Sequence, residues 1–144
     1  MDPQAWGLAL VVTGWPTLVF AAAPTPYVAQ ALFTHAVVHH QPVDSITRLS
    51  GGANQIYYFA DLRNMTGQTV TERWTYHGRL VAQMFFQVRG PRWRVYTRAQ
   101  LAPSEPGVWQ AAVINGAGLT LAVNTLIYQP DAPSGTPPQV HQQQ

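Results

Sequence analysis

Arginines at alternate positions are the residues of this sequence whose types and spacing best suit binding chemistry. Arg92, Arg94 and Arg98 recur at even intervals with Tyr96 among them, so a strand would place all four side chains on one face. Guanidinium groups in such a row donate planar hydrogen bonds to phosphate, sulfate or carboxylate groups, and a tyrosine can stack on a sugar or base. We therefore predict a binding site at these four residues.

The same row has a second interpretation, because alternating charges are typical of the solvated outer face of a sheet. In that case the arginines bind no ligand, and Arg94 pairs with Glu72 or Asp61. Six of the eight arginines lie between Arg73 and Arg98. The sequence alone leaves both interpretations open.

The histidines do not suggest a metal site. His35 and His39 fall on the same side of a strand but are four residues apart, about 13 Å when extended, which is too far to share one ion. His40 is adjacent to His39, and His77 lies in an expected turn. We expect no bound metal and no cofactor.

The acids and serines do not assemble a recognisable catalytic set. Between the two ends of the chain the candidate carboxylates are Asp44, Asp61, Glu72 and Glu105, and their spacing suggests no particular pair for acid–base work. No serine stands in a nucleophile-elbow context. Structural roles fit better: Asp44 would cap a turn and Glu72 would pair with an arginine. We expect no enzymatic activity, with a hydrolase site in the 41–54 loop as the alternative.

Composition removes several mechanisms at once. All eight basic residues are arginine and none is lysine, which excludes Schiff-base lysines and P-loop lysines. The chain has no cysteine, so thiol nucleophiles, cysteine-ligated zinc and disulfides are absent. Stability must come from packing.

Seven segments alternate with a period of two and are separated by turn residues, which predicts β-strands. Their approximate ranges are 29–39, 56–59, 69–76, 80–88, 93–99, 109–113 and 119–127, with 41–54 as a connection. Trp74, Trp93 and Trp109 each lie on the more apolar face of a strand and are predicted to be in the core. We predict an all-β, immunoglobulin-like antiparallel β-sandwich of about seven strands, with an open β-barrel as the alternative.

The two ends of the chain differ in composition from the middle. Residues 1–23 contain an uncharged apolar stretch closed by Ala21-Ala22-Ala23, which is typical of an export signal. Residues 129–144 are rich in proline and glutamine and are predicted to be a disordered tail. The β-sandwich domain is therefore expected at 24–128. The protein is predicted to be periplasmic or secreted, with a membrane anchor formed by the N-terminal segment as the alternative.

Four motifs, taken in order, resemble a known bacterial family. They are 55–64, 69–78, the Gly90-Pro91-Arg92-Trp93-Arg94 run continuing to Tyr96, and Gly107-Val108-Trp109. Together they are similar to the family catalogued as domain of unknown function 2914, over roughly residues 32–128. The resemblance implies an envelope-associated β domain and assigns no catalytic or ligand-binding residue.

These observations favour a non-catalytic exported interaction domain. Its arginine-rich strand could dock an anionic glycan, a lipid head group or an envelope protein, and we expect no specific nucleic-acid ligand. The alternative is a structural or assembly subunit of the cell envelope. The low content of charged residues, 10%, favours this alternative. Such a subunit could form a homo-oligomer through a strand edge.

Overall fold

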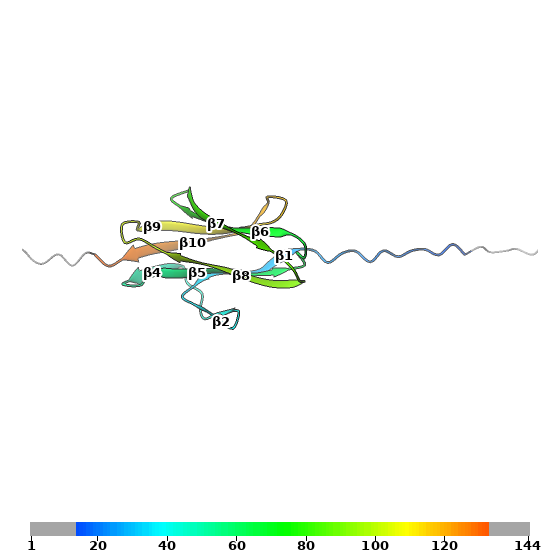
Figure 1. The fold of residues 1–144 in the computed structure, drawn as a ribbon, viewed down its shortest axis with the longest axis horizontal. Helices are drawn as coiled ribbons and strands as arrows, with labels where there is room; N and C mark the ends of the chain where they lie inside the picture. The colour runs from blue at the N-terminus through cyan, green and yellow to red at the C-terminus, as the bar shows by residue number, and fades with distance from the viewer. Residues whose placement is uncertain (1–13, 133–144) are drawn as a thin grey trace, which may run out of the picture.

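The computed structural model describes residues 14–132. Within that range the protein is an all-β, immunoglobulin-like sandwich of two packed sheets (Figure 1). The strands stay in separate sheets, which favours the predicted sandwich over the open barrel. No helix in this range is long and apolar enough to cross a membrane.

Ten strands make up the fold between residues 14 and 132. The three-stranded sheet has the order β1 (Tyr27–Thr34), β5 (Gln55–Arg63) and β8 (Arg92–Gln100). The five-stranded sheet has the order β4 (Arg48–Gly51), β10 (Thr120–Pro130), β9 (Gly107–Ile114), β6 (Thr69–Tyr76) and β7 (Arg79–Gln87). A small hairpin pairs β2 (Val37–Val38) with β3 (Gln41–Pro42). All pairings are antiparallel except that of β10 with β4.

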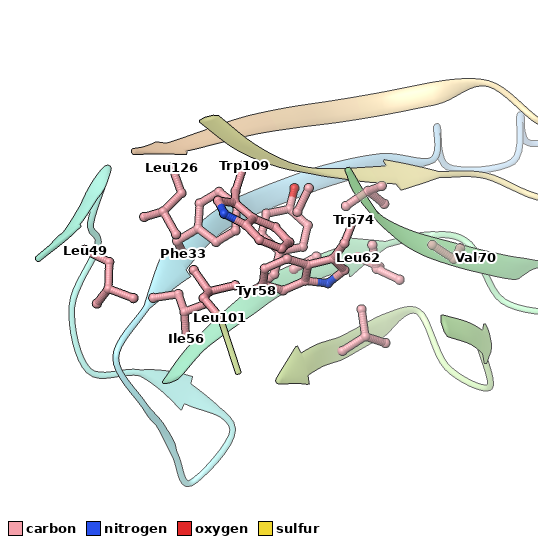
Figure 2. Close-up of a cluster of buried hydrophobic side chains, with 14 of the residues drawn as sticks. Phe33, Leu49, Ile56, Tyr58, Leu62, Val70, Trp74, Leu101, Trp109 and Leu126 are labelled. Carbon is pink, nitrogen blue, oxygen red and sulfur yellow. The ribbon is translucent and has the colours of Figure 1, made fainter. Parts of the chain in front are cut away.

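The core lies between the two sheets, where the apolar side of each alternating strand faces the other layer. Figure 2 shows Phe33, Tyr58, Trp74 and Trp109 gathered there with aliphatic side chains from both layers. The ring centroids of Phe33 and Trp74 are 5.5 Å apart in an edge-on arrangement. The indole of Trp74 donates a hydrogen bond to Thr97 Oγ1 across the sandwich, at 2.7 Å. This contact ties the two sheets together in the middle of the core.

The predicted tryptophan core is correct for two of its three members. Trp74 and Trp109 are each 3% exposed. Trp93 packs against the core but is only partly buried. It is the second residue of β8, close to the Gly90-Pro91 turn.

All seven predicted strands are present, but the region between residues 29 and 54 needs correction. The first strand ends at Thr34 rather than reaching His39, which lies instead in the turn between β2 and β3. The expected connection 41–54 contains two short strands, β3 and β4. β4 completes the five-stranded sheet by pairing with β10, a long-range contact that no local pattern indicates.

The β2–β3 hairpin projects from the three-stranded sheet, on the side away from the other sheet (Figure 1). Leu32 and Phe59 are opposite one another in the β1–β5 register and are buried, yet both lie outside the main core cluster. Alternation places their side chains on the outer face of this sheet. A small second apolar cluster therefore lies on that outer face.

The predicted export signal lies mostly outside the described residues. Residues 14–26 are exposed and form no helix or strand. β10 extends to Pro130, and residues 133–144 of the predicted tail also lie outside the described range.

Candidate functional site

The four predicted site residues lie on one face of β8, as the alternation indicates. Arg92, Tyr96 and Arg98 are exposed and Arg94 is half-buried, whereas Val95 and Thr97 face the core. β8 is an edge strand of its sheet. The row is therefore solvent-accessible on the outer face of the three-stranded sheet.

The structure divides this row into two parts. At one end Arg92 donates a hydrogen bond to Asp61 Oδ2 at 3.0 Å, and Arg94 donates to the backbone oxygen of His40 at 3.3 Å. Further along the strand Tyr96 lies beside Tyr57, with ring centroids 6.1 Å apart. The two parts of the row therefore have different neighbours.

Asp61 partly neutralises the arginine face. It accepts hydrogen bonds from Arg63, at 2.8 and 3.0 Å, in addition to the bond from Arg92. Burial alone would raise the pKa of Asp61, but the hydrogen bonds from Arg63 and Arg92 outweigh it, so the pKa lies below its ordinary value. The expected pairing of Arg94 with Asp61 or Glu72 is wrong, since Asp61 pairs with Arg63 and Arg92.

The hairpin beside this face is fixed at its base by Asp44. The carboxylate accepts hydrogen bonds from Thr34 Oγ1 at 2.7 Å and from the His35 amide at 2.9 Å, and it pairs with the His35 imidazole. The side-chain hydrogen bond from His35 lowers the pKa of Asp44 to about 2. The expected turn-capping role of Asp44 is correct. Among the described residues, no three His, Cys, Asp or Glu side chains are placed to hold a metal ion.

The expected pairing of Glu72 with an arginine is wrong. Glu72 is 0% exposed, and neither of its carboxylate oxygens has a hydrogen-bond partner in the described part of the chain. Burial raises the pKa of Glu72 to about 8. The signal was present in the sequence, because Glu72 falls between Val70 and Trp74 in the inward-facing alternation of β6.

β7 is an exposed edge strand, like β8 in the other sheet. The sequence predicts an exposed strand edge but does not indicate which strand forms it. Leu80, Val81, Met84 and Phe85 are 48–61% exposed. β7 pairs only with β6 in the described part of the sheet, so its other edge is open. From Leu80 to Val88 the strand carries no charged residue and no proline. After Arg79, its first residue, β7 therefore lacks the charged side chains and prolines that usually prevent edge-to-edge pairing.

A hollow lies beside this edge, between the two sheets. It has a volume of about 180 Å³ and is bounded on one side by residues 81–84 of β7 and on the other by residues 97–101, with Trp74 and Trp109 among its other lining residues. Its lining is largely apolar. The open side of the sandwich thus combines an unpaired backbone edge with an adjacent apolar hollow.

The sequence comparison bears directly on the predicted family. Residues 67–125 match the family model described as "Protein of unknown function (DUF2914)". The predicted resemblance is confirmed. The DUF2914 match covers β6 to β9 and part of β10, including the arginine row, Glu72 and the whole of β7. The earlier motif at 55–64 lies outside the matched range. No curated protein matches the chain.

Among solved structures, the CARDB domain of the PF1109 protein from Pyrococcus furiosus is similar to this chain. The TM-score is 0.42 with 8% sequence identity, covering 74% of this chain and 93% of that one. The crystal of that domain contains di-metal ions. The DUF2914 description names no activity.

Proposed function

We propose that this chain is a non-catalytic interaction domain that assembles through the open edge of β7 with a second copy of itself. The observation that carries the proposal is the edge strand β7, which is uncharged after its first residue, Arg79, and lies beside an apolar hollow. An added strand would satisfy the open backbone groups of β7, and its inward side chains would enter the hollow.

Charge favours an antiparallel pair over a parallel one. In a parallel pair in register, Arg79 would face Arg79 of the second copy, and like charges directly opposite are unfavourable. An antiparallel pair centred on Gln83 places Arg79 opposite Gln87 instead. The two copies would then be related by a two-fold axis, which gives a closed, isologous interface. The two five-stranded sheets would join into one continuous sheet.

The Phe85→Lys variant tests this interface. Phe85 is 61% exposed on β7, and a charge there should oppose edge pairing without disturbing the core. We expect the wild-type domain to sediment as a concentration-dependent dimer and Phe85→Lys to dissociate at concentrations at least about tenfold higher. Val123→Lys is the matched control, because Val123 is 55% exposed on β10, away from the edge.

Two outcomes of sedimentation equilibrium would contradict the proposal. One is a wild-type domain that stays monomeric over the micromolar to millimolar range. The other is equal dissociation of Phe85→Lys and Val123→Lys, which would assign self-association to general surface hydrophobicity. Melting curves of both variants should resemble the wild type, since both changes are at exposed positions.

Export is part of the same proposal. The apolar leader and the alanine triplet support a cleaved signal, which would place the domain in the periplasm or outside the cell. We expect the mature protein from native host periplasm and membranes to begin between Ala22 and Thr25. N-terminal sequencing measures this directly, and intact Met1 in a soluble cytoplasmic fraction would rule out export.

A further inference from the structure

The turn of the β2–β3 hairpin is built from an unfavourable pair of residues. His39 and His40 both have left-handed backbone angles, with φ of 50° and 58°, and they form the two-residue loop between Val38 and Gln41. Asn-Gly is the pair that best tolerates such a loop, because side chains with a bulky Cβ substituent are strained there. Backbone strain of this kind clusters at active sites, ligand clamps and switch regions.

The strained turn is held against the arginine row. Arg94, a half-buried residue, donates a hydrogen bond to the backbone oxygen of His40 and so links the turn to β8. A hollow at this point is lined by His40, Arg92, Trp93 and Arg94. Within residues 14–132, positive charge exceeds negative charge on this face, because Asp61 forms ion pairs with both Arg63 and Arg92 and lies opposite Arg94 in the β5–β8 register.

We propose that this hollow binds the oxyanion of a phosphate group, held by Arg94, Arg92 and the imidazole of His40. Guanidinium groups offer several donors in one plane, and those not used by Asp61 or the His40 carbonyl are free to bind oxygen atoms of a ligand. The tetrahedral oxyanion could belong to free phosphate or to a lipid head group. The site is distinct from β7, which lies at the edge of the other sheet.

Titration with inorganic phosphate, followed by amide NMR at constant ionic strength, tests the site. We expect saturable shifts in His40, Trp93 and Arg94 that chloride does not produce. Arg94→Gln should weaken phosphate binding by about tenfold or more, because a bidentate charged donor is lost. Arg73→Gln should bind like the wild type, since Arg73 is an exposed arginine on the five-stranded sheet.

A double change in the turn gives a second, independent readout. His39→Asn with His40→Gly supplies the preferred turn pair and removes the imidazoles. We expect this variant to melt at a higher temperature than the wild type and to bind phosphate more weakly. Weaker binding in a more stable protein separates a binding role from a merely structural one.

Vesicles distinguish the two sources of the oxyanion. Arg94-dependent binding to phosphatidylcholine vesicles containing phosphatidic acid, and not to pure phosphatidylcholine, would identify a lipid head group. Phosphate binding without vesicle binding would identify a soluble phosphate group. The proposal is overturned if wild type gives no saturable shifts with inorganic phosphate, if Arg73→Gln loses binding as Arg94→Gln does, or if the double turn variant binds unchanged.

Discussion

Replacing Glu72 by glutamine should stabilise the domain strongly at alkaline pH and little at acidic pH. The pKa of Glu72 is raised by burial from its ordinary 4.5 to about 8 in the folded protein. The folded state therefore holds a proton that the unfolded state releases between these two values. Stability is fully retained below about pH 4.5 and falls as the pH rises to about 8.

The expected size of this loss is on the order of 5 kcal/mol at pH 9, because each unit of pKa difference corresponds to about 1.4 kcal/mol. Glu72→Gln removes the titrating group, so its free energy of unfolding should change much less over that range. Denaturant unfolding at several pH values between 4.5 and 9 measures how the free energy of unfolding changes with pH in the wild type and in Glu72→Gln. Glu105→Gln is the control, because Glu105 lies in a loop and is not fully buried.

Extending the unfolding measurements below pH 4.5 should reveal an acidic limb of opposite sign. The pKa values of Asp44 and Asp61 are lowered, by the hydrogen bond from His35 in the first case and by Arg63 and Arg92 against burial in the second. Their contribution is present above the unfolded pKa and is lost as the pH falls through the folded one. Wild-type stability should therefore peak in mildly acidic solution. If the free energies of unfolding of the wild type and Glu72→Gln change in parallel from pH 4.5 to 9, the pKa of Glu72 is not raised by burial. Such a result would mean that the Glu72 carboxylate is hydrogen-bonded or hydrated in the folded protein.

The second large change in the free energy of unfolding is expected on replacing Trp74. Trp74→Ala should lower the free energy of unfolding by about 3 to 5 kcal/mol, as for other large buried aromatic residues. The change opens a cavity beside Phe33 and removes the indole donor of Thr97 Oγ1. A loss of this size can unfold a marginally stable domain.

Trp93→Ala provides the comparison, because Trp93 is only partly covered. We expect less than half of the Trp74 effect, measured by chemical denaturation of both variants under the same conditions. An equal or larger loss of unfolding free energy in Trp93→Ala would mean that Trp93, near the start of β8, contributes more to stability than its burial indicates. Trp74→Phe should fall between Trp74→Ala and the wild type, since it keeps most of the packing and loses the hydrogen bond.

Much of the strand layout could be predicted because local patterns determine it. The turn at His77-Gly78 has left-handed φ angles of 46° and 79°, as the glycine there indicated, and it sets the pairing of β6 with β7. The apolar alternation likewise placed the inward face of β8 correctly. Where one face of a strand is buried, its pattern specifies which side chains face the core.

The parts that could not be predicted depend on distant or atypical residues. β4 is a strand because β10 pairs with it, and its own composition resembles a loop. The β2–β3 turn carries His39-His40 where a hairpin signal would be Asn-Gly. A bulge between Trp74 and Thr75 in the β6–β7 register also places Leu80 opposite Thr75, so Leu80 and Met84 lie on different faces although strict alternation would put them on the same one.

The strand face that carries the candidate site could be predicted from the sequence, but the residues that contact its arginines could not. Alternation correctly placed Arg92, Arg94, Tyr96 and Arg98 on one side of a strand. The partners of the arginines come from β5 and from the hairpin. Those contacts arise from sheet order, which a single strand pattern does not contain.

Concentration-dependent amide hydrogen exchange along β7 tests assembly through this edge most directly. In an isolated domain the β7 amides that point toward β6 are protected and those on the open edge exchange quickly. We predict that the open-edge amides of β7 become protected as protein concentration rises, while exposed loop amides do not change. Fast exchange of these amides at every concentration, or protection that appears equally in Phe85→Lys, would contradict assembly through β7.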